Sequence, residues 1–387
     1  MENNDSNKLD PLREARKRFP ITREMIYLDA ACTVPPPEGV IQAAHNFYRD
    51  MSLSGEDRPA LEQQIAGVCQ KFADLVGAAA EEIILIKNTT EGINIAANGI
   101  PFNPGDNVII TELEHLNNVY PWLNLQKRKG VEVRILKSRG GRLHLEDLAP
   151  LVDRRSRALA ISFVTLTGLR IDLKPFGQFC KDHDMVFVVD AIQGIGRLAL
   201  DVKDVLIDIM SCGGHKGLMG PRGTGCLYID HNIVDTIDVA YAGPPHELRH
   251  AGVSTALERA AGIKKFNAGG ANYLGACTLN AGLELVHQVG IDAIESQDLR
   301  LGQLLVDGLE SIRGVEVLSP RHPAESAGIV AIKTVDNPGL AQRLEDRSIR
   351  VALRKSGIRI SPHFYNTEEE IGKTVAAVGE IVGQLGH

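Results

Sequence analysis

The chain has 387 residues, of which 44% are hydrophobic and 24% charged, with a net charge of -7 and a pI near 6.0. This length predicts a large and a small globular domain, and the negative charge argues against a nucleic-acid or anionic-membrane partner. No secretory signal begins the chain, and no apolar run approaches the ~18 residues that span a bilayer. Six scattered cysteines without a C-x-x-C pair are typical of reduced thiols in a cytoplasmic enzyme.

Short β-branched runs alternate with longer amphipathic stretches in the chain up to about residue 230. This alternation predicts an α/β fold with a sheet of seven mostly parallel strands and helices on its faces. The expected strands cover residues 82–86, 107–111, 131–136, 158–164, 185–189, 207–211 and 225–229. The expected helices cover residues 59–76, 90–97, 118–129 and 175–184. The irregular stretch 238–272 is interpreted as a functional loop or a subunit-contact region.

The rest of the chain predicts a smaller α+β unit. Helical patterns over residues 274–288 and 291–312 precede strands near 328–333 and 358–361. Thr367 and Glu370 then fit a capping box at the start of the last helix. We therefore expect a large domain over residues 25–265, and a small domain that combines residues 1–24 with residues 280–387.

Lys216 is the most informative side chain. It follows an apolar run and paired glycines, in Gly213-Gly-His-Lys216-Gly. A lysine presented in this way can form a Schiff base and then move protons at a substrate α-carbon. The alternative is a surface lysine in a glycine-rich turn.

Asp190 ends another apolar run. An aspartate at this place can keep a pyridinium nitrogen protonated, although such residues also bind ribose or magnesium in other folds. No P-loop motif occurs, and Gly194-Ile-Gly196 lacks the third glycine of the dinucleotide fingerprint. Asp190 and Lys216 are 216 − 190 = 26 residues apart, which is compatible with one pocket at the strand ends. Together they predict a site for pyridoxal 5'-phosphate (PLP).

Three further groups fit this site, each with a plainer alternative. The segment 88–94 begins a helix whose free N–H groups, with the hydroxyls of Thr89 and Thr90, can hold a phosphate; an ordinary threonine N-cap is the alternative. His115 can stack on a pyridine ring, or be a surface histidine. Arg359 alternates with apolar residues and suits an α-carboxylate, or a structural salt bridge.

His246-Glu-Leu-Arg-His250 matches the H-E-x-x-H signature of zinc proteases. It follows Gly-Pro-Pro, lacks the apolar helix that such a site needs, and has no evident third ligand. We expect no metal site.

Taken together, the motifs resemble the class V aminotransferase family of fold-type I PLP-dependent enzymes. Cysteine desulfurases, isopenicillin N epimerase-like proteins and C–S lyases belong to this group. The resemblance covers nearly the whole chain and rests on the order of its motifs: Tyr27-Leu-Asp-Ala-Ala, Asn88-Thr-Thr-Glu-Gly-Ile-Asn, Glu114-His115 with Pro121-Trp122, Val189-Asp-Ala-Ile-Gln193, Gly214-His-Lys216, Phe266-Asn-Ala-Gly and Arg359-Ile-Ser-Pro-His-Phe-Tyr-Asn-Thr367.

The resemblance implies a role for each candidate around the cofactor ring. Lys216 would be the Schiff-base lysine, and Asp190 would pair with the pyridinium nitrogen. Gln193 would donate a hydrogen bond to the phenolic oxygen, and His115 would stack on the ring.

It also implies the groups at the two ends of the site. Thr90 or Thr89, together with His215, would contact the phosphate, and Arg359 would bind the substrate carboxylate. Such enzymes are typically homodimers that place the active site at the subunit interface, and the substrate would be an amino acid, a small molecule.

Three departures from the family concern the phosphate end. Gly213 stands where a phosphate-binding serine is common, and Gly270 replaces a threonine that reaches the neighbouring subunit's phosphate. An asparagine often found near Thr165 is also missing. These changes predict fewer or rearranged phosphate contacts.

A fourth departure concerns the reaction. Cysteine desulfurases carry a persulfide-forming cysteine on a loop shortly before the position of Arg359. No cysteine follows Cys277 here, and the segment 351–357 is too short for that loop. A desulfurase is therefore disfavoured, unless Cys32 substitutes.

We accordingly expect a C–S lyase, which eliminates the sulfur substituent of a cysteine S-conjugate or cystine and releases pyruvate, ammonia and a thiol or persulfide. An amino-acid epimerase or an aminotransferase is the alternative. A non-catalytic protein with the same fold is a further one.

Overall fold

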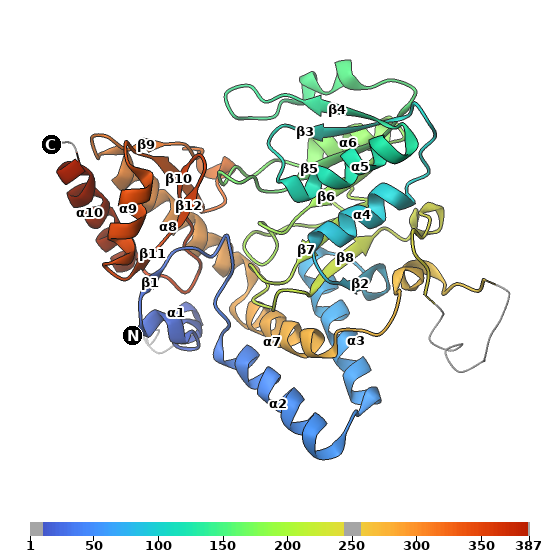
Figure 1. The fold of residues 1–387 in the computed structure, drawn as a ribbon, viewed down its shortest axis with the longest axis horizontal. Helices are drawn as coiled ribbons and strands as arrows, with labels where there is room; N and C mark the ends of the chain where they lie inside the picture. The colour runs from blue at the N-terminus through green and yellow to red at the C-terminus, as the bar shows by residue number, and fades with distance from the viewer. Residues whose placement is uncertain (1–10, 244–256, 386–387) are drawn as a thin grey trace, which may run out of the picture.

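A seven-stranded sheet forms the centre of the larger part of the molecule (Figure 1). The computed structural model describes residues 11–243 and 257–385. Within these residues, β8 is antiparallel to both of its neighbours and the remaining strand pairs are parallel, which confirms the mostly parallel sheet. The order across the sheet is β2 (Ile83–Ile86), β8 (Gly225–Ile229), β7 (Ile209–Gly213), β6 (Val186–Asp190), β5 (Ser156–Ser162), β3 (Asn107–Thr111) and β4 (Glu132–Leu136).

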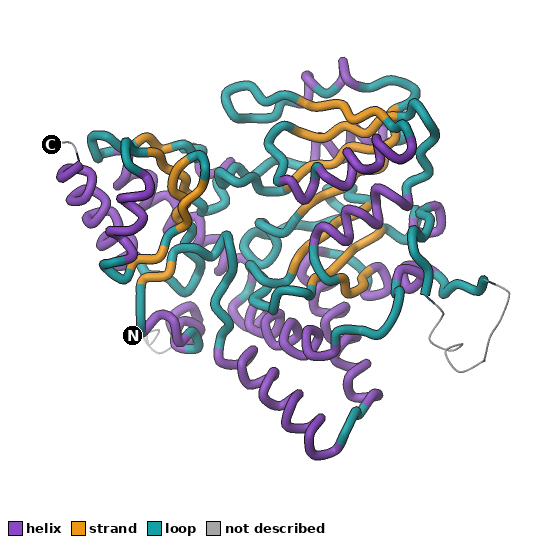
Figure 2. The backbone as a smooth tube through the Cα atoms, in the orientation of Figure 1, coloured by secondary structure: helices purple, strands orange, loops and turns teal. Residues whose placement is uncertain are grey.

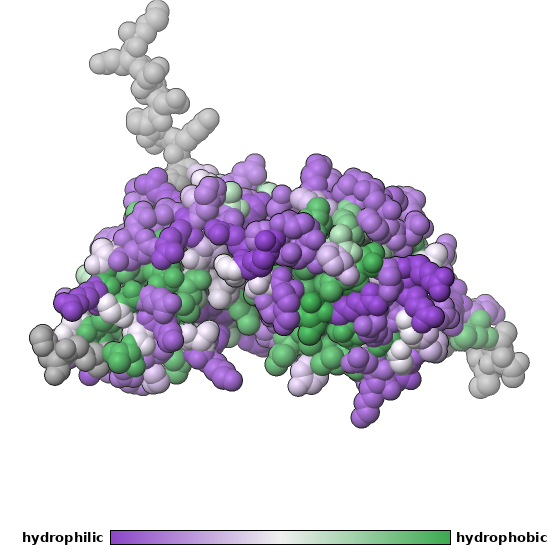
Figure 3. Space-filling model, turned by 90° about the horizontal axis from the view of Figure 1, so that it is seen from above, coloured by the Kyte–Doolittle hydropathy of each residue, from purple (hydrophilic) through white to green (hydrophobic). Residues whose placement is uncertain are grey.

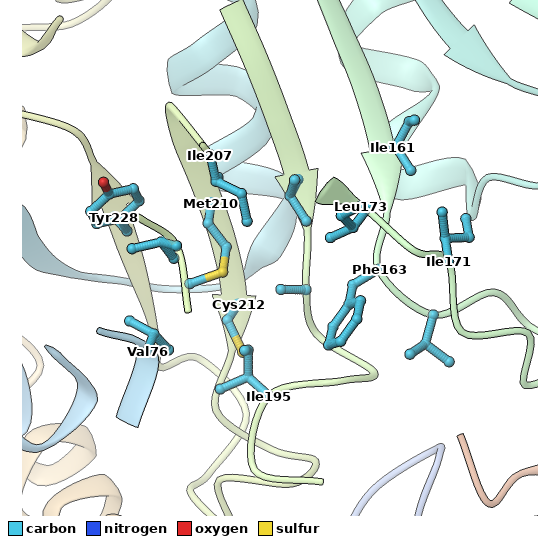
Figure 4. Close-up of a cluster of buried hydrophobic side chains, with 14 of the residues drawn as sticks. Val76, Ile161, Phe163, Ile171, Leu173, Ile195, Ile207, Met210, Cys212 and Tyr228 are labelled. Atoms are coloured by element: carbon cyan, nitrogen blue, oxygen red, sulfur yellow. The ribbon is translucent and has the colours of Figure 1, made fainter. Parts of the chain in front are cut away.

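Helices cover both faces of this sheet because its strands are apolar on both sides. On β3, Val108 and Ile110 join one hydrophobic cluster, while Ile109 joins another on the opposite face. The first cluster includes residues of α4 (Thr89–Gly99) and α5 (Tyr120–Lys129). The second includes residues of α3 (Arg58–Val76), α6 (Lys174–Asp182) and α7 (Tyr273–Val289), and Figure 4 shows part of it.

A smaller unit contains an antiparallel sheet of four short strands. Their order is β12 (Ala352–Arg354), β13 (Gly357–Ile360), β10 (Val330–Lys333) and β9 (Glu316–Val317). The unit's helices are α8 (Ile291–Glu310), α9 (Asn337–Glu345) and α10 (Glu368–Leu385). The sequence analysis missed β9, β12 and α9, which are too short to show a clear hydrophobic period.

The expected capping box at the start of α10 is present. The Glu370 N–H donates to Thr367 Oγ1 at 3.2 Å, and the Thr367 N–H donates to Glu370 Oε2 at 2.9 Å. The same glutamate forms a salt bridge of 2.8 Å with Arg16 of α1 (Pro11–Lys17). In addition, β1 (Ile26–Tyr27) pairs in parallel with β11 (Ile349–Arg350).

The Arg16–Glu370 bridge joins the N-terminal helix to the small unit, and β1 pairs with the same unit although it lies within residues 25–265. The division into a large unit over residues 25–265 and a small unit of residues 1–24 and 280–387 stays a prediction. Loops lie between the large sheet and the small unit (Figure 2). An unpredicted helix, α2 (Glu38–Ser54), packs against α7. Hydrophobic residues reach the surface in separate areas of the molecule (Figure 3). No helix in the two described stretches is long and apolar enough to cross a membrane.

Gly92 of α4 tests how closely this helix must approach the sheet. A Cβ atom at Gly92 would lie 2.2 Å from Ser211 Oγ of β7, so we expect Gly92→Ala to lower the free energy of unfolding by about 1–3 kcal/mol. In Gly39→Ala of α2, the new Cβ meets nothing within 4 Å. That control should be neutral or stabilising, by up to about 1 kcal/mol. Urea denaturation measures both, and equal stabilities would contradict the close packing.

Candidate active site

Two glycine-containing turns meet at the carboxyl ends of β6 and β7. A Cβ atom at Gly196 would lie 2.4 Å from the backbone of Gly217, and a Cβ at Gly217 would lie 2.4 Å from the Ile195 carbonyl oxygen. Gly196 also has a φ of +80°, which favours glycine. The motif Gly194-Ile-Gly196 therefore serves backbone packing. The turn that follows Asp190 can in this way lie against the turn that carries Lys216.

Asp190 and Lys216 interact electrostatically in this place. Asp190 is 4% exposed, and its Oδ1 accepts a hydrogen bond of 3.1 Å from the Ile192 N–H. Burial raises the pKa of Asp190 to about 6, and the charge of Lys216 opposes this rise. Burial lowers the pKa of Lys216 to about 8, with Asp190 opposing. An amine of this basicity is partly neutral near neutral pH, as a proton-transferring base requires.

Neither charged group has its full complement of partners. No described residue donates a hydrogen bond to Asp190 Oδ2, and the Lys216 ammonium forms no hydrogen bond or ion pair with that part of the chain. A buried carboxylate with a free oxygen fits the protonated nitrogen of a pyridine ring. A buried amine without partners fits attachment of an aldehyde.

The N-terminus of α4 lies beside the Lys216 turn. Its N-cap is Asn88, whose Oδ1 accepts from the Glu91 N–H at 3.0 Å, so the threonine N-cap considered above is wrong. Thr89 is buried, and its hydroxyl oxygen accepts from the Gly213 N–H at 3.0 Å. Thr90 instead lines a surface depression of about 580 Å³. The helix end and the Thr89 hydroxyl are thus available together for a phosphate.

The packing around position 213 explains why a glycine stands there. A Cβ atom at this position would lie 2.8 Å from Ile192 Cδ1 and 3.3 Å from Thr89 Oγ1. A serine here would require Ile192 to move. With glycine at this position, Ile192 packs at the end of β7 and the Thr89 hydroxyl is the one that contacts the Gly213 N–H.

His115 follows the turn after β3 and caps a short 3-10 helix (Leu116–Asn118), and its side chain is exposed. Its Nδ1 accepts from the Asn117 N–H at 3.1 Å. The preceding Glu114 is buried and accepts from the Ser162 N–H at 3.0 Å, which fixes the turn. Partial burial, followed by the charge of Lys216, lowers the pKa of His115, so that the imidazole is neutral at neutral pH.

Gln193 and His215 hold the N-terminal loop of residues 28–37 against the site. Gln193 Nε2 donates to the Ala31 carbonyl at 3.0 Å. The His215 carbonyl accepts from the Thr33 hydroxyl at 3.1 Å. Burial and then the charge of Arg222 lower the pKa of the His215 imidazole to about 4, so it is neutral.

Arg359 of β13 is 4% exposed, and its charge acts on both Lys216 and His115. Burial lowers its pKa to about 10. The Arg359 Nη2 atom lies 3.7 Å from Asp29 Oδ1, while its Nε has no hydrogen-bond partner among the described residues. This geometry leaves a buried guanidinium donor for a carboxylate ligand. Sequence reasoning missed Asp29, although its place directly after the apolar pair of the Tyr27-Leu-Asp motif was a usable signal.

A fully buried charge network joins the small unit to the Asp190 turn. Asp298 of α8 lies 2.7 Å from Arg197 Nη1 and 2.8 Å from His363 Nδ1, both measured at Asp298 Oδ2. Arg197 follows the Gly194-Ile-Gly196 turn, and His363 follows β13. The carboxylate therefore connects the segments that carry Asp190 and Arg359.

The hairpin before Arg359 is tight. β12 and β13 are antiparallel, with Arg354 opposite Gly357, so that a two-residue turn of Lys355 and Ser356 joins them. This turn contains no cysteine and has no room for the loop that carries the persulfide-forming thiol of desulfurases.

One cluster has metal-ligand chemistry. Atoms of Glu82, Asp230 and His231 lie within 4.8 Å of one another. The Lys203 ammonium already lies 2.6 Å from Glu82 and 2.9 Å from Asp230, so the cluster is a set of ion pairs. The H-E-x-x-H segment, residues 246–250, lies outside the described residues, as does part of the irregular stretch 238–272.

The fold and this site define a cofactor-dependent α/β enzyme, and comparisons with known proteins give its family. The chain matches the model of the Aminotransferase class-V family over residues 26–373. It is 30% identical to a probable cysteine desulfurase of Methanothermobacter thermautotrophicus, over 96% of this chain and 98% of that protein.

Solved structures agree with this match. The cysteine desulfurase CsdA of Escherichia coli has a TM-score of 0.86 and 28% identity, over 98% of this chain and 100% of that one. The cystine C–S lyase C-DES, at 23% identity, has a similar fold with a TM-score of 0.84, over 94% and 99% of the two chains.

The chain belongs to the class V aminotransferase family, and it is a PLP-dependent enzyme. This confirms the predicted family, fold class and cofactor. Among residues 11–243 and 257–385, Asp190 Oδ2 and the Lys216 amine have no hydrogen-bond partner, and together with the helix end at Thr89 they fit that cofactor.

Asp190 should make the cofactor-free protein less stable as the pH rises. Its pKa is about 6 in the folded chain, against an ordinary 3.8, so the unfolded chain loses this proton first. Stability is therefore lost as the pH rises from about 4 to about 6, by up to about 3 kcal/mol. Asp190→Asn should lack this loss while binding PLP less tightly. Urea denaturation of both proteins across this pH range measures the difference, and parallel pH profiles would contradict it.

Proposed function

We propose that the protein is a C–S lyase that acts on a cysteine S-conjugate or on cystine. The reaction breaks the Cβ–S bond and releases pyruvate, ammonia and a thiol or persulfide. The observation that carries this proposal is the tight β12–β13 hairpin beside an otherwise complete site. This hairpin carries no thiol that could accept sulfur from the substrate as the desulfurase loop does.

Each candidate residue has a role in this proposal. Lys216 attaches the cofactor through its amine, and Asp190 pairs with the pyridine nitrogen. Gln193 donates to the phenolic oxygen, and His115 covers the ring. The phosphate is held at the α4 N-terminus by three residues: Thr89, Thr90 and His215.

Bound PLP supplies an electron sink for the electron pair that is released at the substrate α-carbon. Arg359 orients the substrate by its α-carboxylate, which satisfies the free guanidinium Nε. Lys216, once its amine is free, takes the α-proton; its lowered pKa favours the neutral form that can do so. The electron pair then forms a double bond between the α- and β-carbons. The Cβ–S bond breaks, and its two electrons leave with sulfur.

The proposal extends to assembly and location. Leu116, Tyr120 and Leu123 are exposed apolar side chains on and before α5, next to His115. We infer that they are covered in a homodimer whose interface adjoins the active site. We also infer a cytoplasmic location, because the six cysteines are unpaired.

Product analysis tests the reaction. We expect the PLP-loaded protein to release pyruvate from L-cystine or from a thioether conjugate of cysteine, and Lys216→Ala to release none. Lys203→Ala, which removes a lysine of the distant Glu82 cluster, should keep the activity. Alanine in place of pyruvate would indicate a desulfurase. Deuterium entering the α-carbon without pyruvate would indicate an epimerase, and amino transfer that depends on a keto acid would indicate an aminotransferase.

Arg359 should control substrate affinity. We expect Arg359→Lys to raise KM by about 10- to 100-fold, because lysine loses the bidentate geometry of a buried charged hydrogen bond. The matched control is Arg354→Lys, since Arg354 is exposed and lies 3.9 Å from the same Asp29. Steady-state kinetics measures both, and an equal rise in KM would contradict the assignment.

A further inference from the structure

Cys32 lies in the N-terminal loop of residues 28–37. Its neighbours Ala31 and Thr33 are hydrogen-bonded to different parts of the site. On one side, the Ala31 N–H donates to Ser361 Oγ at 3.0 Å, two residues after Arg359. The Ala31 carbonyl accepts from Gln193 at 3.0 Å. Cys32 is therefore held beside the carboxylate-binding end of the site.

On its other side, the chain is attached to the lysine turn. The His215 carbonyl, directly before Lys216, accepts from the Thr33 hydroxyl at 3.1 Å and from the Val34 N–H at 3.1 Å. These bonds fix the backbone on both sides of Cys32. The residue thus has a defined place between Arg359 and Lys216.

The charges around this place suit an anionic sulfur. Cys32 interacts electrostatically with both Lys216 and Arg359. The Arg359 side chain is 4% exposed, and its Nε has no partner among residues 11–243 and 257–385. A buried donor without a partner indicates a ligand at this end of the site, beside the Cys32 thiol.

Burial acts on the other five thiols. Burial raises the thiol pKa of each, which lowers the thiolate fraction. Four of the five lie inside the large unit, and one is on α7: Cys69, Cys180, Cys212, Cys226 and Cys277. Cys32 is half-buried and unpaired. Cys212 also interacts electrostatically with Lys216, but it is fully buried in β7, whereas Cys32 lies in the loop and is partly accessible.

We propose that Cys32 captures one half of a disulfide amino acid, of which cystine is the simplest, by thiol–disulfide exchange. The proposal rests on the lyase function and specifies its substrate class. The Cys32 thiolate attacks one sulfur of the substrate, the substrate S–S bond breaks, and a Cys32–substrate disulfide forms. The other half leaves as a thiolate and takes up the proton that Cys32 lost, so no external oxidant is needed.

The captured half-cystine keeps its carboxylate for Arg359 and its amino group for the Lys216 end of the site. When its Cβ–S bond breaks, the electron pair stays on sulfur, and Cys32 is left as a persulfide. Pyruvate and ammonia are the other products, after water adds to the released fragment. Cys32 thus retains the sulfur that the elimination releases.

The capture step is tested in PLP-loaded Lys216→Ala, which cannot complete the elimination. The protein is incubated with L-cystine, quenched in acid without reductant, and analysed by intact mass and peptide mapping. We expect half-cystine on Cys32 to form at least about tenfold faster than on Cys277, a second half-exposed thiol that serves as internal control. Lys216→Ala/Cys32→Ser should lack the fast adduct, and Lys216→Ala/Cys277→Ser should retain it.

Cystamine, a disulfide without carboxylates, should react more slowly with Cys32 because Arg359 cannot orient it. Equal labelling of Cys32 and Cys277, equal rates for cystamine and cystine, or no adduct on Cys32 would each overturn the proposal.

A second measurement separates this proposal from the lyase function. A thioether conjugate cannot exchange with a thiol, so pyruvate from it reports elimination alone. Capture on Cys32 without pyruvate from either substrate would support the capture and refute the lyase. Pyruvate without an adduct on Cys32 would support the lyase and refute the capture.

Discussion

The contact between Gly196 and Gly217 is the constraint on which the site depends. Backbone meets backbone there, so a side chain at either position would push the two turns apart. Because Asp190 and Lys216 lie on these turns, their electrostatic interaction depends on that approach. Gly213, at the end of β7, allows Ile192 to pack there, and the Thr89 hydroxyl lies beside the turn.

Burial shifts three charged side chains toward their neutral forms. Desolvation is the largest cause of the raised pKa of Asp190 and of the lowered pKa values of Lys216 and Arg359. Each shift is a free energy that the folded chain gives up in keeping the charge away from water. A ligand with an opposite charge at the right place recovers part of it. The same desolvation that weakens the empty fold therefore favours a cationic ring nitrogen at one end and a carboxylate at the other.

Much of this could be predicted from the sequence, because long apolar runs and their terminal residues are local signals. The seven strands of the large sheet and the capping box of Thr367 and Glu370 are of this kind. Contacts between distant segments had no such signal. The Arg359–Asp29 pair, for example, joins positions 330 residues apart, since 359 − 29 = 330. The Asn88 N-cap is a local contact, but the two threonines that follow it were equally plausible caps. The roles of the site residues remain predictions.

The buried carboxylate of Asp298 has a consequence for substrate shape. It contacts both Arg197 and His363, and so it ties the segment that carries Arg359 to the segment that carries Asp190. The fold then sets the distance between the Arg359 guanidinium, which binds the carboxylate, and the Lys216 amine, which takes the proton. An α-amino acid, whose carboxylate and amino group lie on the same carbon, fits that distance. A β- or γ-amino acid, with one or two extra carbons between these groups, would hold its C–H bond out of reach of the base.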